Sequence, residues 1–262
     1  MTESGPAGVA LNDPFAVLTG PLAATTRMQL EVVGSRPLSP GMQRLVLTAP
    51  ELATLEYRPG QDVMLMVAVD GDRPVRRRYT IRALDPARRL LTLDIVRHAG
   101  GPGERWVAAA RPGDRVEGIG PRGKIFLAPD ADWHLFAGDE SALPAFFAMA
   151  GAVPAGRRAL LILEVPSPED EQDLATRADA EVTWLHRQGR PAGDAAALEA
   201  AVGEVALPAG HGHAYLAGEA KVVLALRDTV RARGLAPEQV SPKAYWGRGR
   251  ANAAHGEPAK DR

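Results

Sequence analysis

Cysteine is absent from this chain of 262 residues. A chain without cysteine forms no disulfide bond, has no thiolate nucleophile, and holds no cysteine-ligated zinc or iron–sulfur cluster with its own side chains. A run of about 18 apolar residues, the length of a membrane-spanning helix, is also missing, and no lysine or arginine precedes Arg27 as it would in a signal peptide. These absences predict a cytoplasmic protein that forms no stable association with a membrane.

An excess of either charge is missing as well. The 31 lysine and arginine residues nearly balance the 32 aspartate and glutamate residues, for a net charge of −1. Balanced charge argues against nucleic acid as a partner, because a phosphate backbone attracts proteins with a basic surface. Hydrophobic residues make up 45% and charged residues 24% of the chain, as in globular proteins. The length fits one large domain or two of ordinary size.

The spacing of the apolar residues changes near residue 130. Before this point, six short runs rich in Val, Ile, Leu, Thr and Tyr are separated by turn sequences such as Pro59-Gly60, which predicts a small antiparallel barrel with one helix over 103–110. After it, apolar strand-like runs alternate with helical patterns, which predicts a parallel sheet with helices on both faces. The predicted fold class is therefore a six-stranded antiparallel barrel followed by an α/β domain with a parallel sheet.

The predicted boundaries follow from the same change of pattern. We expect a tail over 1–24, the barrel domain over 25–130, the α/β domain over 131–250 and a second tail over 251–262. The barrel strands are predicted at 29–33, 43–48, 62–69, 77–83, 90–98 and 115–119. The parallel strands are predicted at 134–137, 159–165, 181–186, 213–217 and 240–246, with helices at 141–150, 195–202 and 220–233.

One glycine-rich segment matches two nucleotide-binding patterns only superficially. Gly118, Gly120 and Gly123 form a G-x-G-x-x-G sequence, and Lys124 follows as in a P-loop. Both motifs require a helix next, whose amide groups bind phosphate, whereas the residues after Lys124 are typical of a strand. A tight turn that leaves the barrel is the better interpretation.

Four arginines lie within the seven residues 76–82. By themselves they fit a solvated edge strand as well as an anion site. A glycine-rich turn at 100–103 opens the predicted helix, and the free amide groups and dipole of a helix N-terminus favour a phosphate. The arginine-rich strand together with this turn therefore suits a pyrophosphate group.

These motifs resemble the siderophore-interacting proteins, a family of FAD-containing ferric-siderophore reductases within the ferredoxin–NADP reductase superfamily. The resemblance covers residues 28 to 251, most of the chain. It rests on five motifs in order: Arg77-x-Tyr79-Thr80-x-Arg82, His98 with Gly101-Pro102 and Trp106, the sequence Gly-Asp-Glu-Ser-Ala-Leu-Pro at 138–144, Ala-Gly-Glu-Ala at 217–220, and Tyr245-Trp246.

The resemblance implies a flavin site on the barrel. Arg77 would pair with the pyrophosphate of FAD, because a planar guanidinium matches phosphate oxygens. Tyr79 would lie against the isoalloxazine ring and Thr80 would form a hydrogen bond near flavin N5, which makes these two the implied catalytic residues. The other residues implied to bind FAD are Asp94, Val96, His98, Gly101, Pro102 and Gly103, the last at a position where the family usually has alanine.

The resemblance also implies that NADPH or NADH docks on the α/β domain as the electron donor. The implied residues follow two predicted strands, at the carboxyl edge of the sheet where open α/β folds bind ligands. They are Gly138, Asp139, Glu140 and Ser141 after the first strand, and Gly218 and Glu219 after a later one. Asp139 and Glu140 fit the ordinary acidic start of a helix equally well.

The implied substrate is a ferric siderophore, whose Fe(III) the flavin reduces so that Fe(II) is released, and we expect a monomer with no metal site of its own. Many such substrates are anionic, so basic residues near the flavin should attract them. The candidates are Lys124, Arg248 and Arg250. The family often has Tyr-Trp-Arg where this chain has Tyr245-Trp246-Gly247, which displaces the basic charge along the sequence.

Two alternatives stay open. A general NAD(P)H flavin reductase or a ferredoxin-type reductase would share the same fold, whereas a non-catalytic siderophore-binding protein would have lost its flavin. The intact Arg77-x-Tyr79-Thr80 motif argues against the non-catalytic protein. Flavin absorbance in the purified protein would exclude it.

Overall fold

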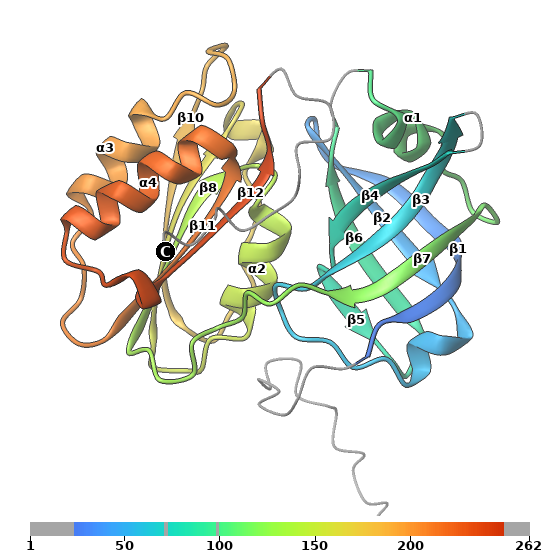
Figure 1. Ribbon diagram of the computed structural model, residues 1–262, viewed down its shortest axis with the longest axis horizontal. Coiled ribbons are helices and arrows are strands. Elements are labelled where there is room, and N and C mark those ends of the chain that lie inside the picture. Colours follow the sequence, from blue (N-terminus) through green and yellow to red (C-terminus); the bar gives the residue numbers. More distant parts are fainter. Residues whose placement is uncertain (1–23, 71–72, 98–99, 249–262) are drawn as a thin grey trace, which may run out of the picture.

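The computed structural model describes residues 24–70, 73–97 and 100–248. Two β-sheets lie side by side in it, an antiparallel sheet of seven strands and a parallel sheet of five (Figure 1). The predicted boundary at 130 falls in the connection between the two sheets, and of the two predicted tails only Ala24 lies within the described residues. Within the described ranges, no helix is both long and apolar enough to cross a membrane.

The first sheet consists of β1 (Thr26–Ser39), β2 (Met42–Thr48), β3 (Asp62–Asp70), β4 (Arg73–Thr80), β5 (Ala83–Asp85), β6 (Leu90–Val96) and β7 (Arg115–Arg122). Its order is β4-β3-β7-β1-β2-β6-β5, and every pair is antiparallel. The antiparallel architecture is confirmed, but the predicted count of six strands is wrong by one. The additional strand, β5, has three residues, too few for an alternating pattern to show in the sequence.

Apolar and polar side chains alternate along the strands of this barrel, and the apolar ones form its core. On β1, the side chains of Met28, Leu30 and Val32 are buried, while the residues between them are exposed or half-buried. Helix α1 (Pro102–Ala109) packs Val107 and Trp106 against the same core. This packing holds the N-terminus of α1 beside β4, the edge strand of the sheet.

The second sheet consists of β8 (Trp133–Asp139), β9 (Arg158–Val165), β10 (Asp179–His186), β11 (Gly212–Glu219) and β12 (Val240–Trp246). All its pairs are parallel, in the order β10-β9-β8-β11-β12. The helices are α2 (Leu143–Gly151), α3 (Ala196–Glu204) and α4 (Ala220–Ala232). The chain order reverses between β8 and β11, and such a reversal opens a crevice at the carboxyl ends of the two strands.

Helices cover both faces of the parallel sheet, as predicted. Leu198 of α3 and Leu226 of α4 belong to the core on one face. Phe146 of α2 belongs to the core on the other face, which also includes Met42 of the barrel, so that α2 lies between the two sheets (Figure 1). Strands β8, β9 and β11 are buried along nearly their whole length, which explains their continuous apolar sequences.

Two polar contacts join the barrel to the α/β unit at separate points. Asp170, which follows β9, accepts hydrogen bonds from Ser39 Oγ at 2.7 Å and from the Gly41 amide at 2.8 Å, in the turn between β1 and β2. Lys243 on β12 places Nζ 3.5 Å from Oδ2 of Asp62 on β3. Both contacts tie a buried carboxylate to the opposite unit.

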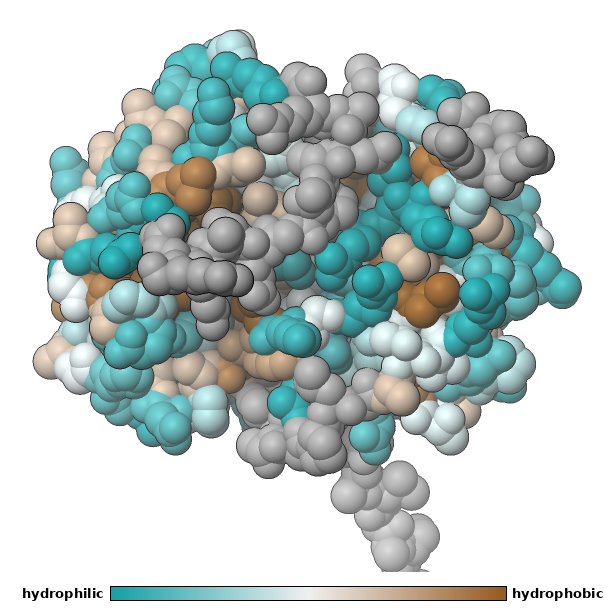
Figure 2. All heavy atoms as spheres, viewed as in Figure 1, coloured by the Kyte–Doolittle hydropathy of each residue, from teal (hydrophilic) through white to brown (hydrophobic). Residues whose placement is uncertain are grey.

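The surface in view carries no broad apolar patch. Hydrophilic residues cover much of the barrel there, and apolar residues show only as small separate spots (Figure 2). Among the residues that the structure describes, Val33 and Leu224 are the large hydrophobic side chains that are exposed. The exposed apolar residues therefore indicate no binding surface.

Candidate active site

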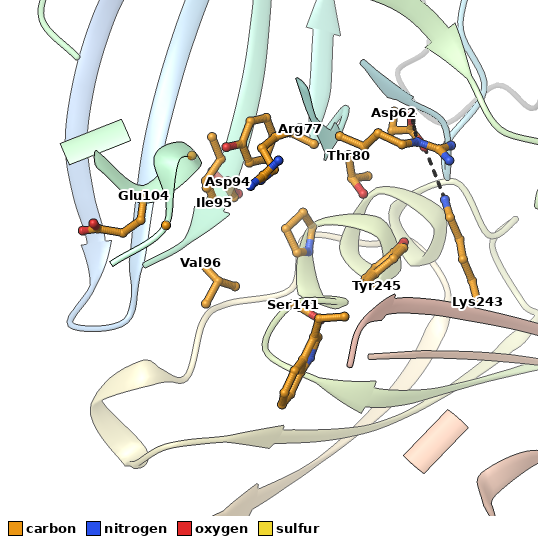
Figure 3. Close-up of a pocket in the computed structure, with 16 residues that line it drawn as sticks. Asp62, Arg77, Thr80, Asp94, Ile95, Val96, Glu104, Ser141, Lys243 and Tyr245 are labelled. Atoms are coloured by element: carbon orange, nitrogen blue, oxygen red, sulfur yellow. Dashed lines mark hydrogen bonds and ion pairs between the residues drawn. The ribbon is translucent and has the colours of Figure 1, made fainter. Parts of the chain in front are cut away.

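A cavity of about 290 Å³ opens between the barrel and the α/β unit. Its barrel side is formed by β3, β4, β6 and the start of α1, and its other side by the start of α2 and the end of β12 (Figure 3). The lining residues are Asp62, Arg77, Arg78, Tyr79, Thr80, Asp94, Ile95, Val96, Gly101, Gly103, Glu104, Ser141, Pro144, Lys243, Tyr245 and Trp246. Because both units contribute, the cavity exists only when they are packed together.

Four consecutive residues of β4, from Arg77 to Thr80, line this cavity. Side chains alternate along a strand, so a cavity on one face would be lined by every second residue. Since β4 is an edge strand, the cavity reaches around its edge to both faces. Thr80 is only 8% exposed and points into the cavity (Figure 3).

The two neighbouring arginines of β4 differ in their charge balance. Arg78 binds the buried carboxylate of Asp62 with two hydrogen bonds, from Nε at 2.9 Å and from Nη2 at 2.5 Å. Arg77 donates from Nη1 to the carbonyl of Arg76 at 2.9 Å, and no carboxylate among the described residues pairs with it. The positive charge of Arg77 is thus available to an anion in the cavity, and that of Arg78 is not.

The N-terminus of α1 approaches this strand very closely at Gly103. A Cβ atom there would lie 2.8 Å from Tyr79 Oη and 3.0 Å from Arg77 Cγ, which is too close for either. Pro102 occupies the first turn of the helix, where the missing N–H costs nothing, and the amide groups that follow have no acceptor within the helix. Burial raises the pKa of the half-buried Tyr79, so its phenol stays neutral.

Asp94 on β6 lines the cavity, yet its charge is balanced within the barrel. Its two oxygens accept hydrogen bonds from Arg44 at 2.6 and 2.7 Å, and Arg82 Nε lies 3.6 Å from Oδ2. The hydrogen bond to Asp94 raises the pKa of Arg44, whereas burial lowers the pKa of Arg82. Val96 supplies an apolar wall next to it, and His98 lies outside the described residues.

The residues of the α/β unit that were predicted to bind NAD(P)H lie together at the carboxyl edge of the sheet. Asp139 ends β8 and Glu219 ends β11, and the backbone amide of Glu219 donates to Asp139 Oδ2 at 2.9 Å. Glu219 caps α4 by accepting from the amides of Lys221 and Val222. Burial raises the pKa of Asp139, and the neighbouring Glu140 adds to this rise.

Glu140 belongs to a buried ion-pair group at the same edge. Its carboxylate binds Arg187 through two contacts of 2.6 Å, and Arg187 also lies 3.3 Å from Glu164. Of the six residues predicted to bind NAD(P)H, Ser141 alone lines the cavity. At Gly138 an added Cβ would overlap the carbonyl oxygen of Ala217, so this glycine is required by the close packing of β8 on β11.

Two of the three basic residues predicted for the substrate, Lys124 and Arg248, do not line the cavity. Lys124 is exposed on the connection after β7, and Arg248 donates from Nη2 to the carbonyl of Ala192. Arg250 lies outside the described residues. Lys243 also lines the cavity, beside Arg77 and Arg78, and the sequence reasoning missed it. Its signal was a lysine two residues before Tyr245, on the same face of a strand.

Comparison with known proteins gives two family matches that together cover most of the chain. Residues 66–125 match the model of the siderophore-interacting FAD-binding domain. Residues 131–249 match the model of the siderophore-interacting protein. The first match includes β4 and α1, and the second includes the whole parallel sheet.

Similar proteins agree with these matches. Ferric vibriobactin reductase ViuB of Vibrio cholerae is 33% identical over 189 residues, 71% of this chain and 69% of that protein. The NADPH-dependent ferric-chelate reductase of Escherichia coli is 30% identical over 180 residues, 68% of each chain. The crystal structure of a siderophore utilization protein from T. fusca superposes with a TM-score of 0.81 at 32% identity, over 90% of this chain and 98% of that one. The chain therefore belongs to the siderophore-interacting protein family.

Proposed function

We propose that this protein is an FAD-dependent ferric-siderophore reductase, which takes electrons from NAD(P)H and delivers them to siderophore-bound Fe(III). The observation that carries the proposal is the cavity between the two units, where the unpaired Arg77 and the N-terminus of α1 lie beside Tyr79 and Thr80. Its similarity to a ferric vibriobactin reductase and to a ferric-chelate reductase supports the choice of substrate class.

The residues present fit FAD. A guanidinium without a carboxylate partner and the free amide groups of Gly103 and Glu104 match the two charges of a pyrophosphate. Gly103 leaves out the Cβ that would push Tyr79 and Arg77 away from this place. Tyr79 offers a neutral aromatic face and Thr80 a hydroxyl group inside the cavity.

FAD supplies a group that accepts two electrons together and passes them on singly. Each NAD(P)H oxidised therefore reduces two Fe(III) ions to Fe(II) and releases one proton. The chain's own residues bind and line the site: Arg77 would hold the anionic end of the cofactor, and Tyr79 and Tyr245 supply aromatic walls. Hard oxygen ligands hold Fe(II) less tightly than Fe(III), so reduction frees the metal.

The donor and the substrate would approach from different sides. The carboxyl edge at Gly138–Ser141 and Gly218–Glu219 is our proposed docking place for the nicotinamide nucleotide, as in other open α/β folds. Lys243 joins Lys124 and Arg248 as a proposed basic residue for an anionic siderophore. One chain supplies both walls of the cavity, which supports a monomer, and a nicotinamide donor supports action in the cytoplasm.

Anaerobic reduction of the purified protein tests this function. The protein loaded with FAD should be reduced by NADH or NADPH in stopped-flow, and a ferric siderophore added next should reoxidise it while a ferrous chelator records Fe(II). The expected yield is two Fe(II) per reduced flavin. Reduction by the donor without any Fe(II) formation would indicate a general flavin reductase, and a protein that binds no FAD would refute the proposal.

A further inference from the structure

Asp139 is a fully used hydrogen-bond acceptor at the carboxyl edge of the parallel sheet. It is 3% exposed. Its Oδ1 accepts from the amide of Ser141 at 2.9 Å and from the Ser141 hydroxyl at 2.5 Å. Its Oδ2 accepts from the amide of Glu219 at 2.9 Å and from the indole Nε1 of Trp246 at 2.9 Å. One carboxylate therefore joins the start of the α2 segment, the end of β11 and the end of β12.

The backbone around Asp139 is shaped to admit this carboxylate. Gly218 has a φ of +139°, and a Cβ atom there would lie 2.5 Å from Asp139 Oδ2. A side chain at 218 would therefore displace the carboxylate from its position. On the other side, Gly193 approaches Trp246, since its Cβ would lie 3.3 Å from the indole Cη2. The indole nitrogen is thus held by a hydrogen bond, and the missing side chain at Gly193 leaves room for the indole ring.

Two partners of Asp139 line the cavity, whereas Asp139 does not. Ser141 and Trp246 belong to the α/β wall that faces Tyr79 and Thr80, and Figure 3 places Ser141 on this wall. An indole N–H that is removed from water without an acceptor costs free energy, so the acceptor decides which orientation the ring adopts. The position of this wall consequently depends on a residue that has no contact with the cavity.

We propose that Asp139 is a positioning residue for the flavin cavity: its buried carboxylate fixes the indole of Trp246 in the wall opposite Tyr79. This inference rests on the proposed function, because it takes the cavity to be the site of FAD. It differs from direct contact of Asp139 with the nicotinamide nucleotide, which would slow reduction by NAD(P)H and leave the spectrum of the bound flavin unchanged.

The test compares Asp139→Asn, Trp246→Phe and the double variant, each loaded with FAD. An asparagine keeps the shape but turns an NH₂ group toward two of the four donors. Asp139→Asn and Trp246→Phe should each change the visible circular dichroism of the bound flavin and weaken FAD binding several-fold. The double variant should match Trp246→Phe alone, because Asp139 acts through the indole. The matched control is Asp132→Asn, which loses acceptors for His211 and Arg157 at the opposite edge of the sheet and should change neither quantity.

Additive effects in the double variant would overturn the proposal. It would also be overturned if Asp139→Asn left the flavin spectrum unchanged and only slowed reduction by NAD(P)H, because this result indicates direct contact of Asp139 with the electron donor. Should Asp139→Asn fail to fold, hydrogen exchange in the parent protein decides instead. The indole N–H of Trp246, assigned by its loss in Trp246→Phe, should be strongly protected; exchange at the rate of an exposed indole refutes the hydrogen bond. Failure of the proposed function is seen separately, as a parent protein that binds no FAD.

Discussion

At the scale of single residues, adjacent side chains of one strand have opposite electrostatic roles. Arg77 and Arg78 have the same charge and lie next to each other, but Asp62 neutralises only Arg78. A guanidinium with a carboxylate partner is a weak anion receptor, because binding an anion would break the existing pair. The pyrophosphate of the proposed cofactor therefore depends on Arg77 and on the glycine that lets α1 approach it.

Replacing Arg77 with alanine should weaken FAD binding about ten- to hundredfold, since a charge-assisted hydrogen bond contributes roughly 1.5–3 kcal/mol. Titration of the apoprotein with FAD, followed by flavin fluorescence, measures this change. The matched control is Arg76→Ala, because Arg76 is exposed on the same strand and does not line the cavity. Equal FAD affinities for the parent and Arg77→Ala would remove Arg77 from the cofactor site.

Gly103→Ala should also weaken FAD binding. The new Cβ would lie 2.8 Å from Tyr79 Oη and 3.0 Å from Arg77 Cγ, so both cavity side chains must shift. Gly101→Ala is the comparison, because a Cβ at Gly101 meets nothing within 4 Å. We expect Gly101→Ala to bind FAD nearly as tightly as the parent, and Gly103→Ala to bind it clearly less tightly. A lower FAD affinity for Gly101→Ala than for Gly103→Ala would contradict the close approach of α1 to β4.

At the scale of elements, the cavity depends on how the barrel turns and the parallel strands meet. The β1–β2 turn is fastened to Asp170 after β9, and β3 is fastened to Lys243 on β12. These contacts lie in different parts of the interface, and the lining of the cavity comes from both units. A substitution that breaks either contact should therefore weaken FAD binding even where no residue that lines the cavity is changed.

Asp170→Ala should lower the free energy of unfolding by about 1–3 kcal/mol, because it leaves the Ser39 hydroxyl and the Gly41 amide without their acceptor. Thermal unfolding of the apoprotein measures the loss. Glu169→Ala is the control, since Glu169 is the exposed neighbour of the buried Asp170. A melting temperature that falls equally for both variants would show that the contact with the β1–β2 turn contributes nothing.

At the scale of the whole molecule, the parallel sheet carries a pH-sensitive pair. His134 on β8 and His213 on β11 are directly paired in register and buried. Burial lowers the pKa of each to about 4, from the ordinary value near 6.5, and neighbouring positive charge adds to the effect. The unfolded chain therefore takes up protons at a higher pH than the folded protein does.

The free energy of unfolding should decrease as the pH falls from about 6.5 to about 4, by up to roughly 1.4 kcal/mol per pH unit for each histidine. Urea unfolding at several pH values in this window gives the slope. His213→Gln keeps a polar group toward Ser241 and should remove one histidine's share of the slope. A parent and His213→Gln with identical slopes would contradict the lowered pKa.

The two kinds of sheet and the local motifs of the proposed cofactor site could be read from the residue pattern alone. Buried strands and amphipathic helices leave periodic patterns within a few residues, so the change near 130 and the helices around it could be predicted. The Arg77-x-Tyr79-Thr80 motif and the glycines before α1 are also local, and Arg77, Tyr79, Thr80 and Gly103 do line the cavity. The three-residue β5 escaped because it is too short to leave a pattern.

Which charged groups have a partner, and which polar groups hold others in place, follows from contacts between distant parts of the chain. Lys243 reaches Asp62 across 181 residues of sequence, and Trp246 reaches Asp139 across 107. No local pattern encodes such pairs, because they depend on the packing of one sheet against the other and on the order of strands within each. Among the described residues, the same packing leaves Arg77 without a carboxylate partner. It also fills the acceptor positions of Asp139 and places Lys243, rather than Lys124 or Arg248, at the cavity.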